Sequence, residues 1–152
     1  MLRFDNVTRT YGARVAVDRL NLHVDRGELF ALLGHNGAGK TTTIKMLVGL
    51  LRPTSGAIYV GPYNVVDNPR EVSRLIGYVP DLPFLYDKLS GREFLRFVAD
   101  MYGMSDGAAA EAVARESDRF QLKEFLDQLT ESYSHGMRQR TVFAAALLHQ
   151  PE

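Results

Sequence analysis

The sequence predicts an α/β fold that is rich in strands at its start and helical at its end. Leu20, Leu22 and Val24 alternate with polar residues, which is the two-residue period of a half-buried strand. The apolar run 29–33 leads into a glycine-rich loop, and from Ser90 onward apolar residues recur with a helical period. These three patterns place strands first, then a strand–loop–helix unit, then a helical region.

Two apolar runs in the first eighty residues are expected to form strands. The run 29–33 lies between glycines and suits a strand that is covered on both faces, as parallel strands are. The run 76–79 is stopped by Pro80. The other elements expected in this part are a helix over 41–50, a turn at 53–56, a short strand at 57–60 and a helix from Pro69 to Leu75.

Two helical stripes are expected after residue 90. Ser90 and Glu93 fit a capping box, in which the serine bonds a backbone amide and the glutamate reaches back. The first stripe consists of Phe94, Leu95, Phe97, Val98, Met101 and Tyr102. The second stripe consists of Leu122, Phe125, Leu126 and Leu129. We expect both stripes to pack in a core.

The composition is that of a globular domain and excludes several kinds of site. The 152 residues hold 18 basic and 18 acidic side chains, so charge gives no reason to expect nucleic acid as a partner. There are no cysteines, which excludes disulfides and thiolate chemistry, and the four histidines lack metal-ligand spacing. No apolar run approaches the roughly 20 residues of a membrane span, and no signal peptide is evident, so a cytoplasmic protein is expected.

A phosphate-binding loop is the strongest motif in the chain. The segment from Gly34 to Thr41 matches G-x-x-x-x-G-K-S/T, and it follows an apolar run and opens a helix, as the motif requires. Glycines let successive amides turn toward a phosphate, Lys40 would reach the β- and γ-phosphates, and the Thr41 hydroxyl would ligate Mg²⁺. The predicted nucleotide contacts are Gly34, His35, Asn36, Gly37, Ala38, Gly39, Lys40, Thr41 and Thr42. The alternative is a glycine-rich turn with an exposed lysine.

Further motifs make the sequence resemble the ATP-binding cassette (ABC) family. Ile76 to Asp81 looks like the strand that leads into the family's Q-loop, and Tyr133 to Arg140 looks like its signature motif. Tyr11 lies in a turn ahead of the loop, where the family places an aromatic ring that stacks on adenine. The alternative for Tyr11 is a turn residue that covers the edge of the sheet.

The resemblance implies a P-loop NTPase fold of the ABC ATPase type. Its parts would be an N-terminal antiparallel β-subdomain, a partial parallel core sheet and an α-helical subdomain, with the C-terminal core strands absent. Residues 1–80 would form the β-subdomain and P-loop core, 81–89 the Q-loop region, and 90–149 the helical subdomain with the signature.

The signature motif implies a contact with the ATP of an opposite subunit. The residues concerned are Ser134, His135, Gly136 and Met137. Ser134 is also a good N-cap for the helix that follows, so the alternative is an ordinary capped helix with surface arginines. His135 and Met137 replace a glycine and a glutamine of the common motif, and the form seen here resembles exporters whose permease is a separate polypeptide.

Asp81 occupies the place of the family's usual glutamine. It could ligate Mg²⁺ together with Thr41, or orient water, although it is shorter than glutamate or glutamine. Lys40 and Asp81 are therefore the candidate catalytic residues. The alternative for Asp81 is a residue that caps its own loop.

The chain reaches Glu152 before the apolar strand, ending in Asp-Glu, that the resemblance predicts. That strand would supply the Walker B aspartate and the glutamate that activates water. No other Asp or Glu except Asp81 follows an apolar strand, so we expect this general base to be missing. We expect a fragment of a larger domain that is inactive alone, although a complete member would be an ATPase. We also expect the run 29–33 to leave backbone groups unpaired.

The leading hypothesis is an ATP- and Mg²⁺-binding subunit that drives a membrane exporter. Its expected partners are an integral membrane permease and a second ABC ATPase subunit, identical or different, and its expected place is the inner face of the cell membrane. One alternative is a soluble ABC ATPase of translation or DNA repair, although the coiled coil of the repair proteins is absent. The others are a non-hydrolysing nucleotide-binding module and a P-loop kinase, which would leave Ser134 to Arg140 unexplained.

Overall fold

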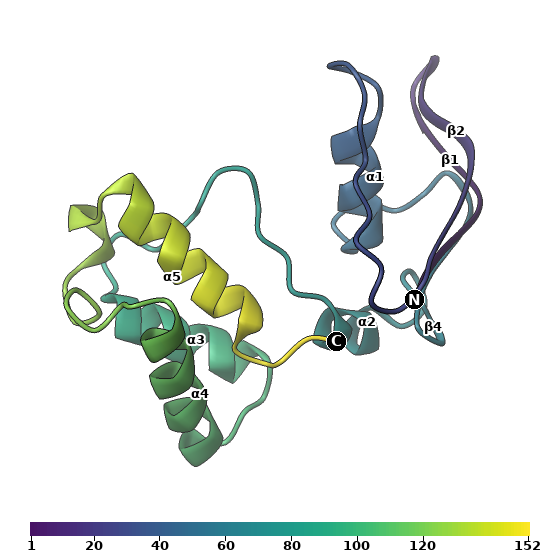
Figure 1. Cartoon of the computed structure of the whole chain (residues 1–152). Coiled ribbons are helices and arrows are strands. Elements are labelled where there is room, and N and C mark those ends of the chain that lie inside the picture. The colour runs from purple at the N-terminus through teal and green to yellow at the C-terminus, as the bar shows by residue number, and fades with distance from the viewer. The chain divides into compact units, whose positions relative to one another are not determined.

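The computed structural model describes all 152 residues, which divide into two compact units. The first unit is Met1–Ile76 and the second is Gly77–Glu152 (Figure 1). The first contains every strand and the second contains the three longest helices.

The first unit is built on one antiparallel sheet. Its strands are β1 (Leu2–Tyr11), β2 (Arg14–Val24), β3 (Ser55–Val60) and β4 (Tyr63–Asn64), in the order β2-β1-β3-β4. The β1–β2 hairpin closes with Tyr11 opposite Arg14, and Gly12 takes a positive φ of 57° in the turn. The predicted N-terminal antiparallel β-subdomain is therefore confirmed.

Two helices complete the first unit. They are α1 (Lys40–Leu47) and α2 (Pro69–Leu75), so the helix that follows the glycine-rich loop is confirmed, although it ends earlier than expected. Met46 of α1 and Val72 of α2 share one buried cluster with the sheet. The other buried members are Phe4, Val7, Val17, Ile58, Val60 and Val65. Contacts of α1 with β2 and β3, together with the burial of Met46 in this cluster, fix α1 and the loop before it on the sheet.

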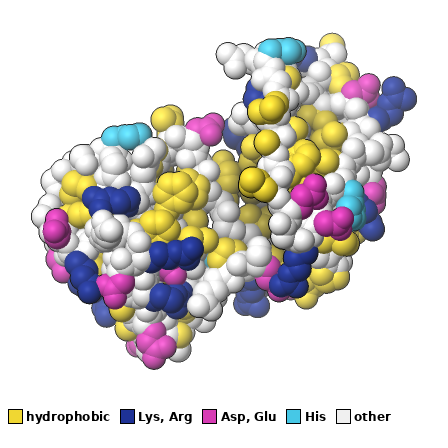
Figure 2. All heavy atoms as spheres, in the orientation of Figure 1, with side chains coloured by type: hydrophobic (Ala, Val, Ile, Leu, Met, Phe, Trp, Pro, Cys, Tyr) yellow, Lys and Arg dark blue, Asp and Glu magenta, His cyan; other side chains and the backbone are white.

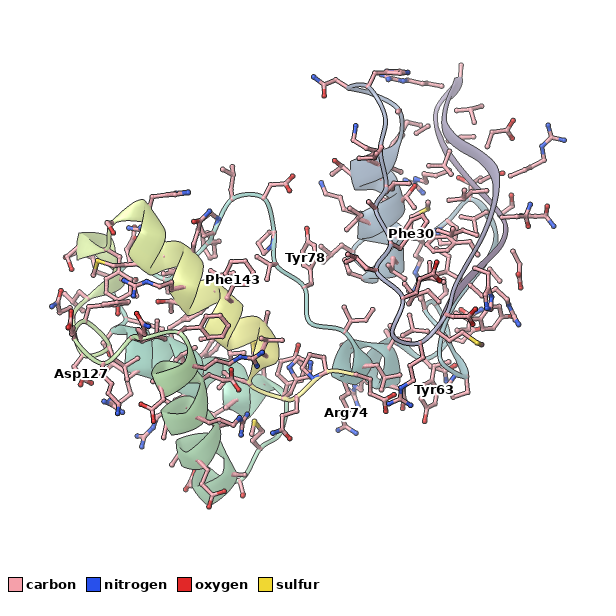
Figure 3. All side chains as sticks on the ribbon, viewed as in Figure 1. Phe30, Tyr63, Arg74, Tyr78, Asp127 and Phe143 are labelled. Atoms are coloured by element: carbon pink, nitrogen blue, oxygen red, sulfur yellow. The ribbon has the colours of Figure 1, made fainter.

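The expected parallel strands are absent. The prediction of a partial parallel core sheet is therefore wrong for these residues, whose only sheet is antiparallel. Neither 29–33 nor 76–79 has strand pairing, because no other segment of the chain supplies a parallel neighbour. Leu29 is 99% exposed, Leu33 is 87% exposed, and Phe30, which Figure 3 labels, is 45% exposed. Hydrophobic side chains are accordingly visible on the surface of this unit (Figure 2). The expectation that this segment lacks backbone pairing is confirmed.

The second unit packs three helices around one core. They are α3 (Gly91–Met101), α4 (Asp106–Arg119) and α5 (His135–Leu147), with a short 3₁₀ turn, η1 (Thr130–Ser132), before α5. The capping box of α3 is confirmed, because Ser90 N donates to Glu93 Oε2 at 2.7 Å and Glu93 N donates to Ser90 Oγ at 3.2 Å. The core joins residues of all three helices to Leu122, Phe125 and Leu126.

The two predicted stripes need correction. Residues 123–127 form turns rather than a helix, since Gln121 takes a positive φ of 54° that ends α4. Leu122, Phe125 and Leu126 are nevertheless buried, whereas Leu129 is exposed. On α3, Phe97 and Met101 are exposed, because only the side that holds Phe94, Leu95 and Ala99 faces the core.

Candidate nucleotide-binding site

The loop before α1 is held open by its backbone. Gly37 and Gly39 have φ angles of 86° and 87°, which side chains rarely allow. A Cβ on Gly39 would lie 2.4 Å from the carbonyl oxygen of Ala16, so this position also requires glycine on steric grounds. Gly39 is the N-cap of α1 and offers no side-chain cap. The first-turn amides, which precede the Thr43 N to Gly39 O bond, are therefore available to a ligand.

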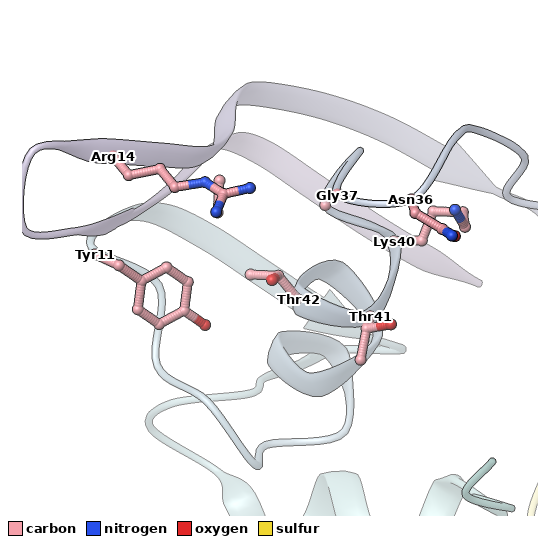
Figure 4. Close-up of a pocket in the computed structure, with 9 residues that line it drawn as sticks. Tyr11, Arg14, Asn36, Gly37, Lys40, Thr41 and Thr42 are labelled. Atoms are coloured by element: carbon pink, nitrogen blue, oxygen red, sulfur yellow. The ribbon is translucent and has the colours of Figure 1, made fainter.

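These amides open on a cavity of about 380 Å³. Its lining residues are Tyr11, Arg14, Ala16, Asn36, Gly37, Gly39, Lys40, Thr41 and Thr42 (Figure 4). Seven of the predicted contacts thus surround one space, whereas Gly34, His35 and Ala38 lie in the loop outside the lining. Sequence reasoning missed Arg14 and Ala16. The hairpin could have revealed Arg14, because it directly opposes Tyr11 across the Tyr-Gly turn.

The charge of the cavity fits an anion. Arg14 and Lys40 line it, and no aspartate or glutamate does. The positive end of the α1 dipole and the unbonded first-turn amides add to the same field. A polyphosphate therefore fits the site, whereas a cation alone does not.

Lys40 folds back on the loop that precedes it. Its Nζ donates to the carbonyl oxygens of Gly34 at 2.6 Å and His35 at 2.9 Å. The His35 ring joins the same network through Nδ1, which lies 2.8 Å from the carbonyl oxygen of Asn36. Two of the three ammonium donors are thus engaged with the protein, and one is left for a ligand.

Tyr11 stands at the end of β1 and is partly exposed in the cavity wall. The guanidinium carbon of Arg9 lies 4.7 Å from the centre of its ring, and Arg9 Nη1 donates to the carbonyl oxygen of Arg52 at 2.9 Å. This cation–π contact steadies the ring beside the loop. Stacking of an adenine on Tyr11 stays a prediction.

The signature residues lie at the start of α5 in the second unit. Ser134 is confirmed as the N-cap, since its Oγ accepts a hydrogen bond from Met137 N at 3.3 Å. His135 and Gly136 are exposed in the first turn, and nothing lies within 4 Å of a Cβ built on Gly136. The preceding Tyr133 is buried, and its hydroxyl donates to the Phe125 carbonyl at 2.8 Å. Burial raises the pKa of the Tyr133 hydroxyl. The contact of these residues with an opposite ATP stays a prediction.

Asp81 is exposed in a bend of the second unit, whereas Thr41 belongs to the first. No group of three or more histidine or carboxylate side chains that could hold a metal exists in the chain. The roles of Thr41 and Asp81 toward Mg²⁺ remain predictions.

A family model described as ABC transporter matches residues 17–152, which is most of the chain. The chain belongs to the ABC transporter family. The bacitracin transport ATP-binding protein BcrA of Bacillus licheniformis is 39% identical over 152 residues, and the linearmycin resistance ATP-binding protein LnrL of Bacillus subtilis (strain 168) is 38% identical. All of the chain aligns with each, but only 49% of each relative is covered, so the chain spans about half the length of these ABC proteins.

Solved structures of ABC proteins share the fold. The ATP-binding subunit of an ABC transporter superposes with a TM-score of 0.88 at 35% identity, covering 99% of this chain and 62% of that one. The ATP-binding cassette MJ0796, solved as a dimer with ADP and Pi, gives 0.85 at 26% identity and is covered to 71%. The predicted ABC ATPase fold is confirmed for the part that these residues span. None of the helices has both the length and the apolar character that crossing a bilayer needs.

Proposed function

We propose that this chain forms the nucleotide-binding part of an ABC exporter's ATP-binding protein. The observation that carries the proposal is the cavity at the start of α1, which combines open amides, two cations and no carboxylate. ATP is the ligand that the family and the charge of this site favour.

The residues present fit Mg-ATP. The first-turn amides of α1 and the remaining donor of Lys40 would hold the phosphates, and Tyr11 would support the adenine. Thr41 would contribute one oxygen to Mg²⁺, whose other ligands would come from phosphate and water, since Mg²⁺ usually keeps few protein ligands. Asp81, which belongs to the second unit, stays a predicted Mg²⁺ ligand. When bound, the ion neutralises part of the charge on the phosphates.

Hydrolysis belongs to the whole protein in this proposal. A general base must lie within hydrogen-bond reach of the attacking water, and no carboxylate lines the cavity. These 152 residues therefore bind nucleotide without turning it over. This also keeps the non-hydrolysing module as the second candidate function.

Two partners complete the proposed assembly. A membrane permease would hold the protein at the inner face of the cell membrane, and a second ATP-binding subunit would receive Ser134, His135, Gly136 and Met137 at its nucleotide. The names of two relatives, which refer to bacitracin transport and linearmycin resistance, support an export role. The exposed start of α5 supports a contact in trans.

Thermal unfolding with and without Mg-ATP tests the binding proposal. At a ligand concentration 100-fold above Kd, binding should add roughly 2.7 kcal/mol and raise the midpoint by several degrees. Lys40→Ala should abolish the shift, whereas Lys45→Ala, an exposed lysine on the same helix, should keep it. An unchanged wild-type midpoint, or a shift that survives Lys40→Ala, would contradict the proposal.

A further inference from the structure

Arg14 is a cavity residue without any partner in the protein. It is exposed at the start of β2 and lines the same space as the loop. No hydrogen bond or ion pair engages its guanidinium, which contrasts with Arg92, Arg115 and Arg138, all paired with carboxylates. Its charge is therefore uncompensated where the cavity is already positive.

The hairpin directs Arg14 toward the loop. Arg14 directly opposes Tyr11 in the β1–β2 ladder, so both side chains leave the same face of the sheet. Its Nη2 lies 3.5 Å from the position that a Cβ on Gly37 would take. In Figure 4 the guanidinium extends from the hairpin toward Gly37, and Tyr11 projects from the same hairpin end.

The geometry points to Arg14 as a second phosphate-binding cation of this site, an inference that rests on the proposed function. Lys40 spends two of its three donors on the loop carbonyls, whereas Arg14 offers all five. A planar guanidinium can hold two phosphate oxygens at once, which a lysine cannot. The ligand chemistry that Arg14 recognises is the polyphosphate chain, not the base.

The Arg14 guanidinium has no hydrogen-bond or ion-pair partner in the folded chain to lose, and the residue is exposed. Replacing it should therefore leave the unliganded protein as stable as before, so that a loss of affinity reports on the ligand.

The test compares three variants by titration with Mg-ADP and Mg-ATP. Arg14→Met removes the charge but keeps the length, Arg14→Lys keeps the charge, and Arg19→Met removes an exposed arginine of the same strand that pairs with Asp18. Arg14→Met should raise Kd for both nucleotides about tenfold. Arg14→Lys should raise Kd by an intermediate factor of about threefold, because lysine keeps the charge but cannot hold two phosphate oxygens at once, and Arg19→Met should bind as wild type.

Pyrophosphate separates a phosphate contact from a base contact. Its ability to displace labelled ADP should weaken about tenfold in Arg14→Met, as the nucleotides do. Wild-type affinity for Mg-ADP and Mg-ATP in Arg14→Met would overturn the inference about Arg14 and leave the proposed function standing. Displacement by pyrophosphate that is unchanged while ADP weakens would also overturn it, because Arg14 would then act on the nucleoside. Absence of any nucleotide binding by the wild-type chain would instead overturn the proposed function.

Discussion

The two helix N-termini that carry the family's motifs are built in different ways. The start of α1 has no side-chain cap, since its N-cap is Gly39, which adopts a positive φ. The start of α5 depends on side chains, because Ser134 caps the first turn and the buried Tyr133 anchors the residue before it. The first arrangement leaves amides free for an anion, whereas the second presents an ordered, exposed edge.

The segments that precede the two helices also differ, because one is exposed and the other is buried. Leu29 and Leu33, in the segment that leads to the α1 loop, are almost fully exposed. The segment that leads to α5 is closed, since Thr130 and Tyr133 are buried and Thr130 Oγ1 donates to the Tyr86 carbonyl at 2.8 Å. The nucleotide loop is therefore fixed mainly from the α1 side, through Met46 and the close approach of Gly39 to Ala16.

The largest effects on stability should come from shortening one buried side chain in each core. Ile58 of β3 and Leu95 of α3 are both fully buried, so Ile58→Ala and Leu95→Ala should each cost about 2–5 kcal/mol. Because the two residues belong to different cores, each change should first expose its own unit to amide hydrogen exchange.

Leu82→Ala is the matched control, because this leucine is 81% exposed and its loss should change stability by less than about 0.5 kcal/mol. Equal loosening of both units by either core substitution would show that they unfold as one. The starts of α1 and α5 would then share one source of stability, and the differences between them could not be treated as independent.

A smaller but more local effect is expected from Gly39→Ala. The positive φ alone should cost about 1–3 kcal/mol, and the clash with the Ala16 carbonyl should displace the loop. Mg-ATP binding should therefore be lost in a titration. Gly12→Ala shares the positive φ but meets open space, so it should keep the site intact. Normal affinity in Gly39→Ala would show that the loop does not need this backbone geometry.

Loss of the Tyr133 hydroxyl before α5 should cost less stability than substitution of Gly39 in the loop. Tyr133→Phe removes the hydrogen bond to the Phe125 carbonyl and should destabilise the second unit by about 1–1.5 kcal/mol in urea unfolding. Tyr63→Phe, a partly exposed tyrosine of β4, should leave stability unchanged. Indistinguishable midpoints for the two variants would remove Tyr133 from the explanation of the signature turn.

The smallest effect should be a change in the stability of the second unit at acid pH. Hydrogen bonds from Ser90 hold the pKa of Glu93 below its usual value, and Arg92 does the same for the pKa of Asp127. A carboxyl group with a lowered folded pKa stabilises above its unfolded pKa of about 4, and this contribution is lost as the pH falls through the folded value. Combining Glu93→Gln with Asp127→Asn should flatten the stability profile below about pH 4.5.

Glu111→Gln, an exposed carboxyl of α4, is the control for that titration. It should leave the acid limb of the unfolding curve as steep as in the wild type. An acid limb that is equally steep in the double variant would show that these two carboxyl groups are not its source.

Sequence reasoning succeeded where the determinants are local. Ser90 with Glu93, Pro69 and Ser134 act on amides or dihedrals within one turn, so their patterns sufficed. It failed where partners are distant or a single dihedral intervenes. The run 29–33 has the composition of a strand but no neighbour. The apolar stripe that begins at Leu122 has a helical period, but it follows the positive φ at Gln121 and lies in turns.

In the candidate site, too, residues set by a local motif were predicted and a residue placed by strand pairing was missed. The loop residues were evident from the motif, because the motif is contiguous and its spacing encodes the turn. Arg14 was missed because its approach to Gly37 depends on the register of the hairpin, which the Tyr11-Gly12 turn alone does not specify. Registers of this kind require the pairing of two strands to be known first.

Amide hydrogen exchange with and without Mg-ATP tests the central claim most directly. If the backbone before and within the first turn of α1 is the binding element, Mg-ATP should protect residues 36–43 in the wild-type chain and leave them unchanged in Lys40→Ala. The capped first turn of α5 should show no such protection in the isolated chain. Protection that appears only at 134–137, or none at 36–43 under saturating Mg-ATP, would contradict the account.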